Sequence, residues 1–300
     1  MIKVIASDMD GTLLGDDHTV APETLKAVKE AQAAGIRFMV ATGRNFTGAM
    51  NELKDLDLEC DYIVGSGAEI RNSKKEIVKV TPLSYQSCKD VYEAAQEFPV
   101  SLIFCTDGPD YRIGTPEEVE ESIYYQIELF HLNMTRDEIK RSRVYRQVKK
   151  NSIAIPDFGE IEKKRLTVYK IFIYTEDLEM LGRLKKKLEK NTELAVSSSF
   201  ISNLEITDVK AQKGPMLKSY IESLGYKMEE VMALGDSLND LSMLSMDFGA
   251  TVAMENGDEE VKKAAKYITK SNTESGVAYT IRELLKRQGG KADGENIRNL

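Results

Sequence analysis

Four short polar segments of the 300-residue sequence combine residue types that could act together on a phosphate group: Asp8–Leu14, Ala41–Arg44, Lys213–Gly214 and Gly235–Asp240. In the first segment two carboxylates have one residue between them, so one can attack phosphorus while the other donates and accepts protons. The second offers a hydroxyl and a glycine that exposes backbone N–H groups, which makes a phosphate seat. The lysine of the third can neutralise a phosphate, and the carboxylates of the fourth can bind a metal ion.

Each segment also has a purely structural interpretation. The first is rich in turn-forming residues, and Thr42 could simply cap a helix ahead of a tight turn. A lone lysine is usually solvated. Ser237 and Asp240 have the spacing of a helix capping box, which is compatible with a metal ligand at Asp236. The functional interpretation therefore depends on where the four segments lie in the fold.

All four segments fall at the carboxyl end of a predicted buried strand or at the start of the helix beside it. Strands and helices alternate at both ends of the chain, which predicts an α/β fold with a doubly wound parallel sheet, and ligands bind such sheets at the carboxyl ends of the strands. The predicted strands are Val4–Ser7, Ile36–Ala41, Tyr62–Val64, Val231–Leu234, Ala250–Met254 and Tyr267–Thr269. The predicted helices are Glu23–Ala34, Asn45–Leu56, Gly214–Leu224, Leu238–Ser245, Glu259–Ala265 and Val277–Leu285.

The middle of the chain has a different character. It contains long charged helices, Glu117–Leu132 and Asp177–Lys190, and an alternating strand, Thr167–Tyr174, that indicates a sheet with one covered face and one open face. We interpret residues 83–190 as an inserted α+β domain that interrupts a single core domain. The core is then formed by residues 1–82 and 191–287, and the polar, glycine-containing tail 288–300 is predicted to be disordered.

Composition argues against several functional classes. A net charge of −8 without a dense Lys/Arg block disfavours binding to nucleic acid or to an anionic membrane. The sequence shows neither a signal-like apolar start nor an apolar stretch of about 18 residues, so we expect a protein that is neither exported nor membrane-spanning. Three cysteines at no metal-ligand spacing indicate the reducing cytoplasm, and the presence of only two histidines argues against a histidine-based zinc site.

The four segments, in this order, resemble the four motifs of the haloacid dehalogenase (HAD) superfamily. The closer resemblance is to Cof-type phosphatases, in which a large C2-type cap is inserted between motifs II and III of a Rossmann-like core. Two positions depart from that pattern: Ser66 stands where an asparagine is usual, and Glu255 stands where a glycine is common. Further local matches are Val252–Met254, Asn256, Ser271–Asn272 and Gly276–Ala278.

The resemblance implies a Mg²⁺-dependent phosphatase acting on a small phosphorylated metabolite. It implies that Asp8 attacks phosphorus to form an aspartyl phosphate, and that Asp10 protonates the leaving group and then activates water. Mg²⁺ would be bound by the carboxylates of Asp8 and Asp236 and by the backbone carbonyl of Asp10. The other implied roles are phosphate binding by the Met9 backbone, Thr42, Gly43, Lys213 and Asn239, with Arg44 and Asp240 in support.

Two alternatives stay open at this point. A phosphomutase would use the same aspartyl phosphate but pass the phosphate to a second sugar hydroxyl, and a regulator would bind a phosphorylated metabolite without turnover. Sugar phosphates, nucleotides and vitamin phosphates such as pyridoxal phosphate or flavin mononucleotide all fit, and the sequence does not determine the oligomeric state. In the insertion, the turn Thr106–Asp110 is either a loop overhanging the site or a plain hairpin turn.

Overall fold

The computed structural model describes residues 1–130 and 134–289 and divides into two compact units. The first unit combines Met1–Val80 with the chain from Lys210 onwards, and the second is the continuous segment Thr81–Val209. The sequence placed the second boundary at residue 190, which is too early. The hairpin of β10 (Leu194–Ser197) and β11 (Asn203–Asp208) pairs with the sheet of the insertion and not with the core.

The described residues of the first unit form an eight-stranded sheet in the order β14-β13-β12-β1-β2-β3-β4-β5. Neighbours from β14 to β3 are parallel, whereas β4 and β5 form an antiparallel edge that the sequence analysis did not predict. Parallel neighbours need long crossover connections, which the helices supply. The strands are β1 (Val4–Ser7), β2 (Arg37–Ala41), β3 (Asp61–Val64), β4 (Glu69–Arg71), β5 (Ile77–Val80), β12 (Val231–Gly235), β13 (Ala250–Ala253) and β14 (Tyr267–Ile268).

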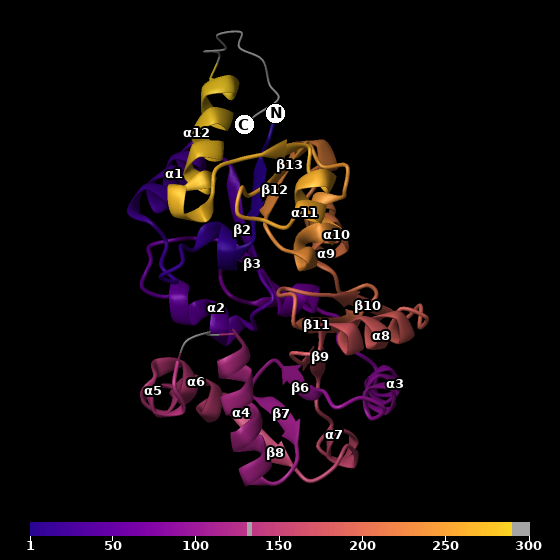
Figure 1. Ribbon diagram of the computed structural model, residues 1–300. Coiled ribbons are helices and arrows are strands. Elements are labelled where there is room, and N and C mark those ends of the chain that lie inside the picture. The colour runs from indigo at the N-terminus through magenta and orange to yellow at the C-terminus, as the bar shows by residue number, and fades with distance from the viewer. Residues whose placement is uncertain (131–133, 290–300) are drawn as a thin grey trace. The chain divides into compact units, whose positions relative to one another are not determined.

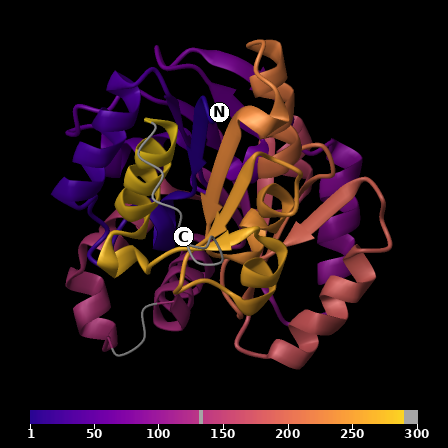
Figure 2. The same cartoon turned by 90° about the horizontal axis from the view of Figure 1, so that it is seen from above.

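Helices cover both faces of this sheet, so the unit is doubly wound, as predicted. The helices are α1 (Pro22–Ala33), α2 (Phe46–Leu53), α9 (Lys213–Ser223), α10 (Leu241–Leu244), α11 (Glu259–Ala264) and α12 (Gly276–Gln288). Both views show α12 beside α1 on one side of the strands, with α9 to α11 on the other side (Figures 1 and 2). Successive residues of a strand face opposite ways, so Ile5 packs in the cluster with α1 and α12, and Ala6 in the cluster with α9 and α10.

Several predicted helix boundaries shift by a few residues. Asn45 is the N-cap of α2, its side chain accepting the N–H of Gly48 at 2.8 Å, and the helix ends at Leu53 instead of Leu56. Helix α12 extends to Gln288, the first residue of the predicted tail, and residues 290–300 lie outside the described part of the chain. Within the described residues, no helix combines the length and apolar character needed to cross a membrane.

The second unit contains a six-stranded sheet in the order β10-β11-β9-β6-β7-β8, counted over the described residues. Its remaining strands are β6 (Ser101–Thr106), β7 (Asp110–Ile113), β8 (Ser152–Ile155) and β9 (Val168–Tyr174). Its helices are α3 (Tyr85–Ala95), α4 (Pro116–Phe130), α5 (Arg136–Arg141), α6 (Arg143–Asn151), α7 (Gly159–Lys163) and α8 (Leu178–Leu188). The turn Thr106–Asp110 joins the antiparallel strands β6 and β7, which makes it a hairpin turn. Residues 131–133, which include the predicted helix end at Leu132, are outside the described residues.

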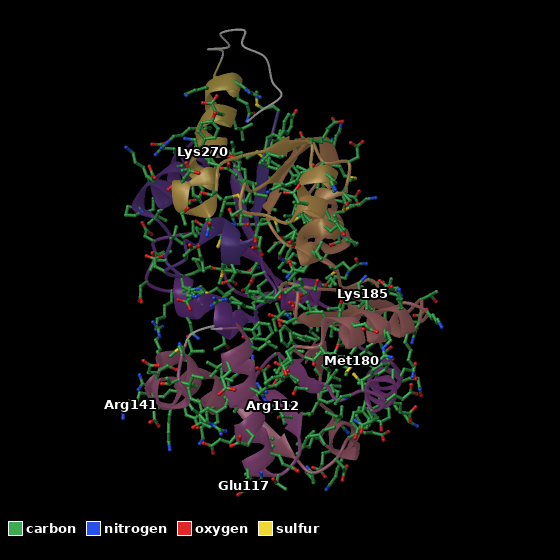
Figure 3. All side chains as sticks on the ribbon, viewed as in Figure 1. Arg112, Glu117, Arg141, Met180, Lys185 and Lys270 are labelled. Carbon is green, nitrogen blue, oxygen red and sulfur yellow. The ribbon has the colours of Figure 1, made fainter. Side chains whose placement is uncertain are left out.

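The two faces of this sheet are covered differently. On one face, residues such as Phe104 and Ile171 pack against α3, α7 and α8. On the other face, the buried Arg112 donates to the hydroxyl of Tyr174 at 2.9 Å and to Ser122 of α4 at 3.1 Å (Figure 3). Helix α4 therefore covers part of the face that was expected to be open.

Candidate active site

The pairing of β1 with β12 brings residues from distant parts of the sequence to one edge of the sheet. Ser7 pairs with Leu234, and the N–H of Asp8 donates to the carbonyl of Leu234 at 2.9 Å. Asp8 and Asp236 therefore leave the sheet at the same edge, and the side of β1 opposite β12 is occupied by β2, which is followed by Thr42. Every residue that the sequence assigned to the site lies in this unit.

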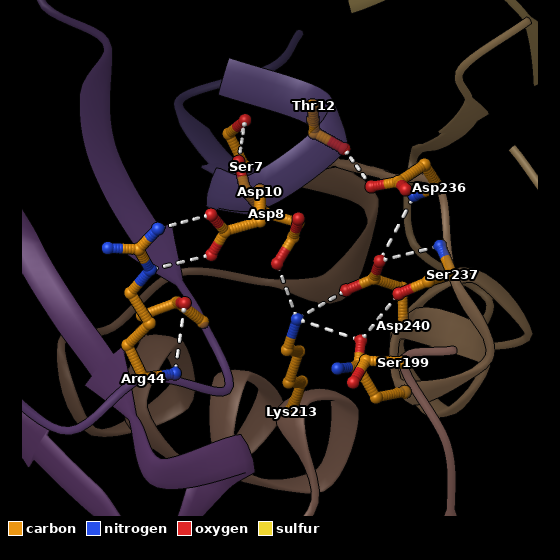
Figure 4. Close-up of polar contacts among 12 residues, drawn as sticks. Ser7, Asp8, Asp10, Thr12, Arg44, Ser199, Lys213, Asp236, Ser237 and Asp240 are labelled. Carbon is orange, nitrogen blue, oxygen red and sulfur yellow. Dashed lines mark hydrogen bonds and ion pairs between the residues drawn. The ribbon is translucent and has the colours of Figure 1, made fainter. Parts of the chain in front are cut away.

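Lys213, the first residue of α9, is fully buried among the strand-end carboxylates (Figure 4). Its Nζ donates to Asp8 Oδ1 at 2.6 Å, to Asp240 Oδ1 at 2.6 Å and to Asn239 Oδ1 at 3.2 Å. Burial by itself would lower the pKa of Lys213, but the two carboxylates outweigh burial and raise that pKa. Lys213 is thus a buried ammonium that neutralises part of a carboxylate cluster, and the alternative of a solvated lysine is wrong.

Asp240 holds the loop that follows β12. Its Oδ2 accepts the backbone N–H groups of Asp236 at 3.0 Å and Ser237 at 3.1 Å, so this carboxylate has the capping role indicated by the sequence. Thr12 donates its hydroxyl to Asp236 Oδ1 at 2.7 Å and orients that carboxylate. Burial, followed by repulsion from Asp240, raises the pKa of Asp236 to about 7. The same two causes, in the same order, raise the pKa of Asp8 well above its ordinary value.

The carboxylate cluster fits a divalent metal ion. One oxygen from each of Asp8, Asp236 and Asp240 lies within 4.8 Å of the others. Hard cations such as Mg²⁺ prefer carboxylate oxygens, and a bound cation would offset the mutual repulsion in this cluster. Because Asp240 already accepts from Lys213 and from two backbone N–H groups, Asp8 and Asp236 fit the ligand role better.

The chain leaves β1 through a tight turn, Met9–Leu13, which Asp8 precedes and which contains Asp10. Gly11 has a φ of +78°, and a Cβ at this position would lie 2.4 Å from Asp236 Oδ2, so both backbone and space require glycine. Met9 is buried in the core, which leaves only its backbone for a ligand. The Asp10 side chain is 42% exposed, whereas the Asp8 side chain is 6% exposed.

Arg44 holds Asp10 in a bidentate pair (Figure 4). Its Nε donates to Asp10 Oδ2 at 2.9 Å and its Nη2 to Asp10 Oδ1 at 2.6 Å, a geometry that fixes a carboxylate in its plane. Its Nη1 donates to Glu52 Oε1 at 3.0 Å, and its backbone N–H donates to Thr42 Oγ1 at 3.2 Å. Arg44 was predicted from the sequence as a supporting residue, whereas Glu52 and Thr12 were not, because neither stands out as part of a chemical pattern.

Two asparagines from the C-terminal part of the unit brace the turn after β1. Asn256 donates from Nδ2 to the carbonyl of Gly11 at 2.8 Å and accepts the N–H of Asn272 at 2.9 Å. Asn272 in turn donates from Nδ2 to the carbonyl of Leu14 at 3.1 Å. These local matches to the family pattern therefore have a physical role, which is to hold the loop that carries Asp10.

Ser66, one of the two departures from the family pattern, has a left-handed backbone with a φ of +59°. Its N–H donates to the carbonyl of Thr42 at 3.0 Å, which places this residue directly behind the loop after β2. Asparagine adopts the left-handed region more readily than serine, so backbone conformation accounts for an asparagine preference at this position.

Replacing Lys213 by methionine should lower the free energy of unfolding by about 3 kcal/mol, because two buried carboxylates would lose their counter-charge. Urea unfolding at neutral pH, followed by circular dichroism, measures this change. Lys54→Met removes the same charge from an exposed position and should change stability by less than about 0.5 kcal/mol. Equal stability of the two variants would show that the Lys213 network does not hold this unit together.

The fold is a doubly wound α/β sheet that gathers aspartates at its strand ends, an arrangement typical of phosphate-processing α/β hydrolases. Residues 5–281 match the family model of the haloacid dehalogenase-like hydrolases, and the chain belongs to this family. The resemblance inferred from the four motifs is thereby confirmed.

Several similar proteins are named as phosphatases. The 5-amino-6-(5-phospho-D-ribitylamino)uracil phosphatase YcsE of Bacillus subtilis is 30% identical over 94% of this chain and 95% of its own. The pyridoxal phosphate phosphatase YbhA of Escherichia coli is 26% identical over 93% of this chain and 97% of its own. Among solved structures, a haloacid dehalogenase-like hydrolase from B. subtilis has a TM-score of 0.82 at 28% identity, covering 95% of this chain and 100% of that one.

Proposed function

We propose that this protein is a Mg²⁺-dependent phosphatase that hydrolyses the phosphate monoester of a small metabolite through an aspartyl phosphate on Asp8. The observation that carries the proposal is the contact between Asp8 and Lys213 at the end of β1, with a second, exposed carboxylate two residues away at Asp10. A buried carboxylate beside an ammonium suits a nucleophile, and an exposed carboxylate can meet a leaving group.

In the first half of the reaction, a carboxylate oxygen of Asp8 attacks phosphorus. The bond between phosphorus and the ester oxygen breaks, its electron pair stays on the leaving oxygen, and protonated Asp10 donates a proton to that oxygen. Lys213, through its hydrogen bonds to Asp8 and Asp240, would orient these carboxylates and offset their negative charge during the attack. Thr42 and Gly43, at the end of β2, would bind phosphate oxygens together with the Met9 backbone N–H.

In the second half, water attacks the phosphorus of the aspartyl phosphate. Asp10, now ionised, accepts a proton from this water, and the bond between phosphorus and the Asp8 oxygen breaks to restore the carboxylate. Asn239, which Lys213 holds at 3.2 Å, would bind the departing phosphate. Asp8 and Asp236, with the Asp10 backbone carbonyl, would hold Mg²⁺, which supplies neutralisation of the charge on the transferring phosphoryl group.

The proposed substrate is a small phosphorylated metabolite, such as a sugar phosphate, a nucleotide or a vitamin phosphate. Support comes from the two relatives YcsE and YbhA, whose substrates are a phosphorylated ribitylamino-uracil and pyridoxal phosphate. A cytoplasmic location is part of the proposal and rests on the three cysteines, Cys60, Cys88 and Cys105, which are free thiols.

A panel of phosphorylated metabolites, incubated with the purified protein and Mg²⁺, tests the proposal through release of inorganic phosphate. The proposed phosphatase releases phosphate from at least one metabolite. Transfer of the phosphate to a second hydroxyl of a sugar, seen by product analysis, would instead identify a phosphomutase. Binding without turnover would identify a regulator and would overturn the proposal.

We expect the inserted unit to determine substrate choice, because every proposed catalytic residue lies outside Thr81–Val209. Exchanging this segment for the equivalent one of a related phosphatase should change the ranking of substrates in the panel, with individual preferences moving about 10- to 100-fold. Mg²⁺ dependence and aspartyl phosphate formation should survive.

The matched control for this exchange keeps the native insertion and replaces the exposed pair Ile77 and Val78 on β5, just before the junction, by threonines. This control should leave the substrate ranking unchanged. A folded chimera with the native ranking would place selectivity in the first unit.

A further inference from the structure

Glu52 is a carboxylate near the end of α2 that no motif singles out. Its side chain is 18% exposed, and its Oε1 accepts from Nη1 of Arg44 at 3.0 Å. Glu52 lies in the last turn of α2 (Phe46–Leu53), where a negative charge is not favoured by the helix dipole, so the carboxylate does not serve its own helix. Its described contact is therefore directed toward the site and not toward its own helix.

The guanidinium of Arg44 is held on two sides. Nε and Nη2 engage both oxygens of Asp10, and Nη1 engages Glu52, so three of its nitrogens are fixed by two carboxylates. Burial by itself would lower the pKa of Arg44, but these two carboxylates outweigh burial and raise it, which keeps the guanidinium charged. Because the guanidinium is planar and rigid, a bond to Nη1 also fixes the direction in which Nε and Nη2 point. Glu52 thus determines where Arg44 presents its two donors to Asp10.

Asp10 needs such an anchor more than Asp8 does. Asp8 is buried and accepts a hydrogen bond from Lys213, whereas Asp10 lies on a turn with 42% of its side chain exposed. General acid catalysis requires the carboxyl group to lie within hydrogen-bond reach of the leaving oxygen, and small displacements are costly. An exposed side chain on a turn has this precision only when a partner restricts its rotation.

We propose that Glu52 is a positioning residue for leaving-group protonation, acting through Arg44 on Asp10. This inference rests on the proposed phosphatase function and adds a residue to it. In this role Glu52 acts only through its bond to Arg44, so its loss should impair proton delivery and leave nucleophilic attack by Asp8 intact. Esters that need a proton on the leaving oxygen should therefore be affected far more than esters that do not.

The test compares Glu52→Gln with the wild type on phenyl phosphate and 4-nitrophenyl phosphate. The two esters have similar shape, but phenolate leaves poorly without a proton and 4-nitrophenolate leaves readily. The measured quantity is kcat/KM, because it reports the steps up to departure of the leaving group and is insensitive to hydrolysis of the aspartyl phosphate. We expect kcat/KM to fall about 10-fold for phenyl phosphate and less than about 2-fold for 4-nitrophenyl phosphate.

Two further variants make the test specific. Asp55→Asn removes the same charge from an exposed position close to Glu52 and should leave both rates unchanged. Glu52→Asp retains the carboxylate one methylene short of Arg44 and should recover part of the loss on phenyl phosphate. Thermal unfolding by circular dichroism verifies that each variant folds.

The outcomes separate this inference from the proposed function. Equal losses on both esters would indicate a purely structural role for Glu52, and unchanged rates on both would show that Arg44 needs no anchor; either result overturns the inference while the phosphatase function stands. A wild-type protein that releases phosphate from neither these esters nor the metabolite panel would overturn the proposed function itself.

Discussion

Replacing Asp8 by asparagine should reduce phosphatase turnover by about 10⁴-fold or more while the protein stays folded. An amide oxygen cannot form the aspartyl phosphate, and loss of a nucleophile typically removes several powers of ten in rate. The fold should tolerate the change because Lys213 keeps its bond to Asp240. An asparagine at this position also removes the repulsion between Asp8 and Asp240, one of the causes of the raised pKa of Asp8.

The measurement is single-turnover and steady-state phosphate release, with unfolding temperature recorded in parallel. The Asp55→Asn variant is again the matched control, since it makes the same substitution at an exposed position. Asp8→Asn with near-normal turnover would disprove the covalent mechanism.

Removing divalent metal with EDTA should silence the enzyme, and Mg²⁺ in excess should restore it. Ca²⁺ should substitute poorly, because it takes more ligands at longer distances than Mg²⁺ and would displace Asp8 from the phosphorus. Asp236→Ala should raise the Mg²⁺ concentration needed for half-maximal activity, since it deletes one of the proposed ligands. Full activity in chelator would contradict the proposed metal site.

The metal requirement should also depend on pH. Burial, followed by repulsion from Asp240, raises the pKa of Asp236 to about 7, so a proton competes with the cation below that pH. Titrations with Mg²⁺ at about pH 6 and about pH 8 should show weaker apparent binding at the lower pH. Equal apparent Mg²⁺ binding at the two pH values would contradict the role of Asp236 as a ligand that must lose a proton. In the chelation experiment above, EDTA already saturated with Mg²⁺ is the control for direct effects of the chelator.

Most of the first unit could be predicted because its strands are buried on both faces. All four residues of β1 are buried, and such runs are readable as strands without knowledge of their partners. The edge strand β5 was missed because all four of its residues are exposed, which removes the apolar signal. The boundary at 190 was wrong because the local sequences of β10 and β11 are compatible with either sheet. Only long-range strand pairing decides which sheet they join.

The candidate site, too, could be predicted only in part. Asp8, Lys213 and Asp236 were predicted as site residues because their segments follow buried strands or open a helix. The folded chain brings Asp8 and Lys213 into direct contact. The bond from Thr12 to Asp236 joins residues 224 positions apart, and nothing in either segment indicates it. Supporting contacts of this kind depend on the tertiary approach of two loops, which a local pattern does not contain.

The division of the first unit between two distant chain segments has a consequence for how the site comes into existence. Asp8 and Lys213 are 205 positions apart, and the whole of Thr81–Val209 lies between them. On the ribosome, every strand of the six-stranded sheet emerges before Lys213 does, so the insertion can pair internally while β1 still lacks β12. Asp8, the proposed nucleophile, therefore acquires Lys213 and Asp236 as neighbours only late in synthesis, and a chain that stalls inside the insertion carries this aspartate without either of them.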